Sequence, residues 1–312
     1  MICRDVIFFR IRVVMDDTQG TTPDDTLDEV QEVVRSRWRL SFASEQDYDF
    51  NPPFHLQEYE IVRHDSQKVN ITLIDDGKLF GGSKTRGLAP YIRHCPSKVF
   101  CYAGPGTAAG AFALSVVCNY YHKKAVLYIV GNSTPTIRVA RKLGASVLTK
   151  FRSVDAAERR LARDYPPHKG TIIPFGMHDS TFQTHLTSSF MDAWPKSHCP
   201  RRVWIACGSC VLLRALAATL PLNTIYCIVQ VGVSVWPDIL DEFIPNRYIL
   251  YDVRKRTDPI NGYTFVEPAR ILPPWGSYDN YDAKIYELLL QHAEDGDYVM
   301  NVASQHNLQI PV

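Results

Sequence analysis

The strongest constraint on the fold is an alternation of apolar strand-like runs and helical segments in the middle of the chain. The elements predicted there, in chain order, are a strand at 98–102, an apolar helix ending near 118, a strand at 125–130, a helix at 135–143 and a strand at 145–148. Gly144 follows the second helix and is a good helix terminator. This rhythm predicts a parallel sheet, which binds its ligands at the carboxyl ends of its strands.

A lysine held in a glycine-rich turn precedes these elements. Residues 69–74 alternate like a strand, and the chain then reaches Gly81-Gly82-Ser83-Lys84 before a helix. If the backbone packs closely around the lysine stem, its amine loses water, its pKa falls, and it becomes a nucleophile able to form a Schiff base with an aldehyde. A polar loop before a helix is the competing interpretation.

These features together resemble a known family. The motif G-G-S-K-T-R-G-L at 81–88, the strand and glycine-rich turn after it, and R-K-L-G-A-S-V at 141–147 resemble the fold type II, tryptophan synthase beta-like, pyridoxal-phosphate enzymes. The similarity spans about residues 70–305 and is greatest to the branch of aminocyclopropane-carboxylate deaminase and D-cysteine desulfhydrase. It implies a two-lobed α/β fold with parallel twisted sheets flanked by helices.

The resemblance also implies a division of the chain into domains. Residues 66–95 and 186–312 would form the large cofactor-binding domain, and residues 96–185 a small α/β domain. Residues 1–65 would be an N-terminal extension packed on the large domain. Within that extension, 27–34 favours a short helix and 35–39 forms a basic patch, and residues 1–15 lack the pattern of a signal peptide.

Site residues follow from the same resemblance. Lys84 would hold pyridoxal phosphate as a Schiff base, and the turn of Gly208, Ser209 and Cys210 would bind its phosphate. Small side chains let backbone N–H groups approach phosphate oxygens, and the helix that follows favours negative charge. Asp282 would pair with the pyridine nitrogen. The alternatives are a tight strand-to-helix turn at 208–210 and an acidic residue at a helix N-terminus for Asp282.

Other expectations concern substrate contacts. Tyr281, which precedes the acidic residue, and Tyr278 in the aromatic loop 254–280 are candidates for contacts with the substrate or the ring. The family presents a serine and an asparagine after the first small-domain strand, where this chain has Gly106, Thr107 and Ala108. Thr107 alone offers a hydroxyl there. If Asp282 does not reach the ring, Ser304 or Asn301 takes its place.

Three functions remain open at this point. The first is lyase or deaminase chemistry on the amino group or α-carbon of a small amino acid, with Lys84, Thr107 and Tyr281 as catalytic residues. The second keeps the cofactor but acts on an aminoacylated nucleotide in viral DNA hypermodification, and only this alternative brings in nucleic acid. The third is a non-catalytic binding protein of the same fold. The resemblance also suggests a homodimer.

Composition narrows the class of protein. The chain has 312 residues, 46% hydrophobic and 21% charged, with a net charge of +1, so it has no electrostatic signature of a nucleic-acid binder. No apolar run reaches the roughly 18 residues that span a bilayer. The eight cysteines lie mostly in apolar segments, which favours a reducing, cytoplasmic location. Cys207 and Cys210 have the spacing of a redox pair, but no second pair completes a zinc site, so no metal is expected.

Overall fold

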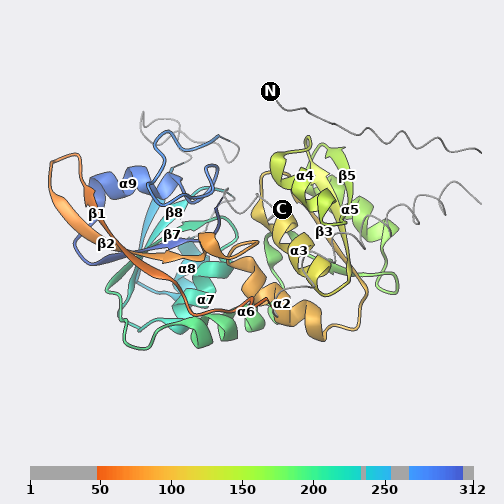
Figure 1. Ribbon diagram of the computed structural model, residues 1–312, viewed down its shortest axis with the longest axis horizontal. Coiled ribbons are helices and arrows are strands. Elements are labelled where there is room, and N and C mark those ends of the chain that lie inside the picture. Colours follow the sequence, from red (N-terminus) through yellow and green to blue (C-terminus); the bar gives the residue numbers. More distant parts are fainter. Residues whose placement is uncertain (1–47, 233–236, 254–266, 305–312) are drawn as a thin grey trace, which may run out of the picture.

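The protein is described by a computed structural model that covers residues 48–232, 237–253 and 267–304. Its chain folds into two lobes, each built on its own sheet, with helices α2 (Lys84–His94) and α6 (Ser180–Ala193) between them (Figure 1). The expectations for residues 1–15, 27–34 and 35–39 lie outside the described residues. Among the residues described, no helix has the length and apolar character needed to cross a membrane.

The larger lobe is built on a six-stranded sheet in the order β1-β2-β10-β7-β8-β9. Its strands are Leu56–Val62 (β1), Lys68–Asp75 (β2), Asp297–Asn301 (β10), Arg202–Cys207 (β7), Ile225–Gln230 (β8) and Tyr248–Asp252 (β9). The β1–β2 hairpin is antiparallel and every other pairing is parallel. Strand β1 therefore adds an edge strand from within the segment predicted as an extension.

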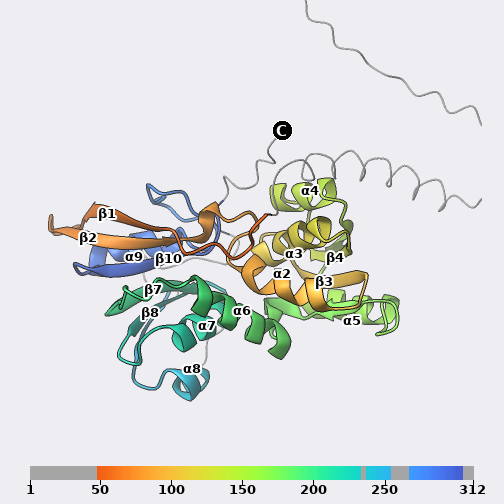
Figure 2. The same cartoon turned by 60° about the horizontal axis from the view of Figure 1, so that its bottom comes forward.

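Helices cover both faces of this sheet (Figure 2). One face packs on α6, α7 (Val211–Thr219) and α8 (Pro237–Phe243), and the other on α9 (Lys284–His292). Strand β7 shows the reason, because its residues alternate between the two cores. Ile205 belongs to the core under α7, while Trp204 belongs to the core under α9.

The smaller lobe is a four-stranded parallel sheet in the order β5-β4-β3-β6. The strands are Val99–Pro105 (β3), Lys124–Val130 (β4), Ser146–Phe151 (β5) and Thr171–Ile173 (β6). Helices α3 (Ala109–Tyr120) and α4 (Pro135–Lys142) cover one face and α5 (Val154–Asp164) the other. The α/β class with parallel sheets flanked by helices is confirmed.

A glycine sets how closely the two helices between the lobes approach. A Cβ atom on Gly87 of α2 would lie 2.8 Å from the Phe182 ring and 2.9 Å from the Leu186 Cβ of α6. Any larger residue would push the helices apart. Two short 3-10 helices precede them in the chain. These are η1 (Asp76–Lys78), between β2 and α2, and η2 (Phe175–Met177), between β6 and α6.

The start of α2 is held by a buried ion pair. Arg86 donates from Nε and Nη2 to the two carboxylate oxygens of Asp76, at 2.9 and 2.7 Å, and both side chains are about 1% exposed. Its Nη1 donates to Asn51 Oδ1 and to the Pro52 carbonyl. The guanidinium also lies 4.2 Å from the centre of the Phe54 ring. One side chain thus ties η1, α2 and the segment before β1 together.

We expect Arg86→Ala to lower the free energy of unfolding by about 3–5 kcal/mol, because it leaves the Asp76 carboxylate buried without its partner. Urea unfolding followed by circular dichroism measures the change. Arg160→Ala is the control, since Arg160 pairs with Asp164 at the surface and its loss should have little effect. Equal losses in the two variants would contradict this account.

Candidate active site between the lobes

Lys84 is positioned by two glycines with left-handed backbone. Gly81 has φ 90° and Gly82 has φ 74°, a region that L side chains rarely adopt. A Cβ on Gly82 would lie 2.4 Å from the Val302 carbonyl oxygen, and that oxygen accepts the Ser83 backbone N–H at 2.9 Å. The turn therefore presses against the chain just beyond β10 and sets Lys84 as the first residue of α2.

The Lys84 amine lies in an environment that disfavours its charge. Burial lowers the pKa of Lys84 from 10.5 to about 8, and the nearby Asp282 carboxyl opposes that shift. Its side chain still keeps a small exposed fraction. An amine with a pKa of about 8 is neutral in a sizeable fraction near neutral pH, which is the state that attacks a carbonyl carbon.

Asp282 is buried close to this amine. Its Oδ2 accepts the backbone N–H groups of Val302 and Ala303 at 3.1 and 3.0 Å. Its Oδ1 is buried and has no hydrogen-bond partner among the described residues. Burial raises the pKa of Asp282 well above its usual value. The carboxyl does not cap α9, since the cap residue Ala283 has no side-chain cap bond and Asp282 bonds to the chain after β10.

The turn after β7 lies beside the same carboxyl. Cys207 ends the strand, Gly208 and Ser209 form the turn, and Cys210 is the cap residue before α7, in the left-handed region with φ 60°. Ser209 Oγ donates to the Gly176 carbonyl at 2.8 Å, which joins this turn to η2 at the edge of the smaller lobe. The turn therefore lies where the two lobes meet.

Tyr281 connects the turn to the acidic residue. A Cβ on Gly208 would lie 3.4 Å from the Tyr281 hydroxyl, and the Gly208 backbone N–H bonds to that oxygen. Burial raises the pKa of Tyr281 well above its usual value, and the nearby Cys207 and Asp282 add to the effect. The hydroxyl is therefore a neutral donor and acceptor at neutral pH.

Thr107 follows β3 on the small-lobe side. Its Oγ1 is buried and has no hydrogen-bond partner within the described part of the chain. The neighbouring glycines have a local reason, because Cβ atoms on Gly104 and Gly110 would lie 2.8 and 3.0 Å from the Tyr102 hydroxyl. Tyr102 fills the space under this turn, so these two glycines are required by packing.

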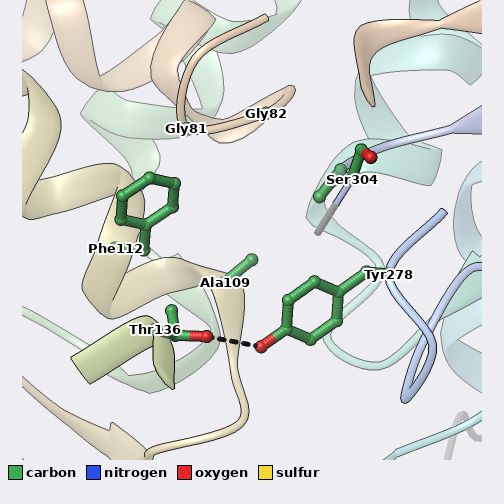
Figure 3. A pocket seen from close by; sticks show the side chains of 8 residues that line it. Gly81, Gly82, Ala109, Phe112, Thr136, Tyr278 and Ser304 are labelled. Carbon is green, nitrogen blue, oxygen red and sulfur yellow. Dashed lines mark hydrogen bonds between the residues drawn. The ribbon is translucent and has the colours of Figure 1, made fainter. Parts of the chain in front are cut away.

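A cavity lies at the junction of the lobes (Figure 3). It is small and partly open to solvent, and no charged side chain of the described residues lines it. Its lining residues are Gly81, Gly82, Ala109, Phe112, Thr136, Tyr278, Ala303 and Ser304. Thr136 of α4 and Tyr278 share a hydrogen bond of 2.9 Å across it, which links the smaller lobe to the loop before α9.

Asn301 and Ser304, the alternatives to Asp282 as partners of a pyridine nitrogen, differ in their surroundings. Asn301 donates from Nδ2 to Asp75 Oδ1 at 2.8 Å and to the Gly276 carbonyl at 3.1 Å. Its Oδ1 accepts the Ser277 hydroxyl at 2.8 Å. Asn301 thus ties β10 to β2 and to the loop before α9, whereas Ser304 lines the cavity.

Two basic residues join the site that the sequence analysis did not single out. Burial of the His178 imidazole lowers its pKa, and the charges of Arg214 and Lys84 lower it further. Arg214 also favours the charged form of Cys210. His178, Arg214 and Lys84 therefore act on one another electrostatically beside the 208–210 turn. The sequence does not reveal that these three residues meet, because three separate segments of the chain carry them.

Comparison with known proteins supports the fold. No family model and no curated protein matches this sequence. Among solved structures, an ACC deaminase homologue aligns over 84% of this chain and 92% of its own, with 13% identity and a TM-score of 0.60. Diaminopropionate ammonia lyase from Escherichia coli, in complex with an aminoacrylate-PLP azomethine reaction intermediate, aligns over 89% of each chain at 12% identity and a TM-score of 0.56.

A third structure is O-acetylserine dependent cystathionine beta-synthase from Helicobacter pylori, with 12% identity, 84% and 95% coverage and a TM-score of 0.55. The fold is that of the fold type II enzymes. This confirms the architecture expected from the motif around Lys84 and from the order of strands and helices along the chain. At these identities the likeness concerns the fold.

The depressed pKa of Lys84 gives a prediction for stability. Between about pH 8 and 10.5 the unfolded chain binds more protons at Lys84 than the folded chain does. Burial of the charged Lys84 amine therefore lowers the free energy of unfolding fully below pH 8, and this loss disappears as the pH rises to 10.5. Lys84→Met should therefore stabilise the protein at pH 7, and the gain should shrink between pH 8 and 10.5. Urea unfolding of both proteins across this pH range measures the difference between their free energies of unfolding. Lys196→Met, at an exposed lysine, is the control. The same pH-dependent gain in the free energy of unfolding in this variant would contradict the prediction.

Proposed function

We propose that this chain is a pyridoxal-phosphate-dependent enzyme of the lyase or deaminase type, acting on the amino group or α-carbon of an amino acid. The observation that carries the proposal is a buried amine, Lys84, with a pKa of about 8 beside a buried carboxyl, Asp282, that has one oxygen without a partner. Perturbed titratable groups of this kind are concentrated at catalytic sites. The structural neighbours support the class, since they include a deaminase homologue and an ammonia lyase with bound PLP.

The residues present fit this cofactor. Lys84 would bind its aldehyde carbon covalently. The unpartnered Oδ1 of Asp282 would accept a hydrogen bond from a protonated ring nitrogen. Because buried polar atoms normally have partners, this atom is evidence that the site fits the cofactor. The backbone of Gly208, Ser209 and Cys210 would hold the phosphate at the start of α7. When bound, the cofactor supplies an electron sink that stabilises negative charge at the substrate α-carbon.

The chain's own groups would then handle protons and position the substrate. Lys84 would move a proton at the α-carbon, a role that suits an amine whose pKa lies close to neutral pH. Tyr281 keeps its phenolic proton and can donate a hydrogen bond. The Thr107 hydroxyl offers a further donor to a substrate carboxylate or to the ring hydroxyl. Phe112 and Tyr278, which line the cavity beside Gly81 and Gly82, would give the substrate an apolar wall.

The proposal is tested by adding pyridoxal phosphate to the purified protein and trapping it with borohydride. Peptide mapping should place the label on Lys84. Lys284 is an internal control, because it too is buried and burial lowers its pKa to about 8. Label on Lys284, or no label on any lysine, would overturn the proposal. A screen of amino acids for those that change the absorbance of the bound cofactor then identifies the substrate class.

The phosphate turn gives a second prediction. Gly208→Asp puts a negative charge where the phosphate should bind, so occupancy by pyridoxal phosphate should fall by at least tenfold while the melting temperature of the protein alone changes little. Gly208→Ala is the matched control, since its Cβ would make only an ordinary contact of 3.4 Å with Tyr281. Equilibrium titration by absorbance measures both. Normal binding by the Asp variant would place the phosphate elsewhere.

A carboxylate at the ring gives a third prediction. Asp282→Asn keeps a hydrogen-bonding group of the same shape but removes the charge, so pyridoxal phosphate should still bind with a modest loss of affinity. Turnover of an amino acid found in the screen should fall by orders of magnitude, because the electron sink is weakened where charge develops. Unchanged turnover would remove Asp282 from the catalytic machinery.

A further inference from the structure

The turn proposed to hold the phosphate is bracketed by two thiols. Cys207 and Cys210 are both free cysteines, 2% and 7% exposed, and both side chains belong to the core on the α7 side of the sheet. The two sulfurs therefore lie on the same side of β7, separated in the chain by Gly208 and Ser209. The function proposed above uses the backbone of this turn and assigns no role to the pair of thiols.

The backbone at Cys210 is strained. With φ 60°, Cys210 has the left-handed conformation that glycine adopts without cost. A cysteine at such a position points to a use for its side chain, because strained residues persist where the surrounding structure or the function holds them. Position 208, two residues earlier, does have a glycine, so the chain places small residues in this turn.

The two thiols are chemically unequal. The Cys207 thiol bonds to the Cys210 sulfur, which lowers the pKa of Cys210, and the Arg214 guanidinium one turn along α7 lowers it further. The same contact raises the pKa of Cys207. Cys210 is therefore the nucleophile of the pair and Cys207 is the thiol positioned to react next.

We propose that Cys207 and Cys210 are a site of reversible oxidation by hydrogen peroxide, forming a disulfide that closes over the Gly208-Ser209 turn and switches off anion binding there. The second half of this statement rests on the function proposed above. The disulfide would close a small ring through the Gly208 and Ser209 amides. Fixing that ring removes the freedom of those amides to point at a phosphate.

The chemistry balances with peroxide as the only oxidant. The Cys210 thiolate attacks one peroxide oxygen, the O–O bond breaks, and hydroxide leaves and is protonated to water, so Cys210 becomes a sulfenic acid. The Cys207 sulfur then attacks the Cys210 sulfur. The S–O bond breaks, the S–S bond forms, and the Cys207 proton leaves with the hydroxyl as a second water. Two thiols lose two electrons in total and peroxide gains them.

The test uses the full-length protein, reduced and then treated with a small excess of hydrogen peroxide. After alkylation under denaturing conditions, peptide mapping should find Cys207 and Cys210 unalkylated and linked within one peptide, and dithiothreitol should reverse the link. Cys207→Ser and Cys210→Ser should each abolish it. Cys199→Ser is the matched control, since Cys199 is an exposed single thiol, and should leave it unchanged. Sulfinic acid at Cys210 without a disulfide, or oxidation of Cys199 alone, would overturn the proposal.

The effect on the turn is measured separately by titrating the reduced and oxidised proteins with pyridoxal phosphate. The oxidised form should bind at least tenfold more weakly, and dithiothreitol should restore the affinity. Equal affinities in the two forms would overturn the link between the disulfide and the turn. If the disulfide forms but the reduced protein does not bind pyridoxal phosphate either, the proposed function is wrong and the thiol pair stands as an oxidation site.

Discussion

The chain just after β10 is the point on which the rest of the site depends. Its Val302 carbonyl accepts the Ser83 N–H, and its Val302 and Ala303 N–H groups bind the Asp282 carboxylate. One short backbone segment therefore fixes the lysine turn on one side and the acidic residue on the other. Gly82 has to be glycine because a Cβ would collide with the same carbonyl oxygen. A shift of this segment would move both functional groups together.

This arrangement places two ionisable groups where neither is well hydrated. Burial lowers the pKa of Lys84 and raises the pKa of Asp282, while their mutual attraction opposes both shifts. Such a pair costs stability unless its remaining polar atoms find partners. The unpartnered Oδ1 of Asp282 is therefore better explained by binding than by folding. The contrast with Arg86 and Asp76 is informative, since that buried pair satisfies both carboxylate oxygens and serves the fold.

Much of the fold was predictable because its signals are local. The strand and helix periodicity between 98 and 148 gives three strands of the small parallel sheet, β3, β4 and β5. The lysine motif predicted the fold family for the same reason. Strand β1 was not recognised, because it forms as an edge strand only by pairing with β2, and that pairing cannot be read from its own residues.

The site was less predictable, since it depends on distances between elements. His178 comes close to Lys84 and Arg214 only through tertiary folding. The glycines around 104–110 resemble a ligand turn in sequence, but two of them make room for Tyr102. Asn301 looked like a candidate partner for the ring, yet its side chain holds β2 and the loop before α9.

The central claim is that Lys84, Asp282 and the 208–210 turn form one site for one cofactor. A crystal structure of the protein soaked with pyridoxal phosphate tests it most directly, through the distance between Asp282 Oδ1 and the pyridine nitrogen. The account predicts a hydrogen bond of about 2.7–3.2 Å, with the phosphate on the backbone of Gly208 and Ser209. A distance beyond about 4 Å would contradict it, because no hydrogen bond forms at that separation.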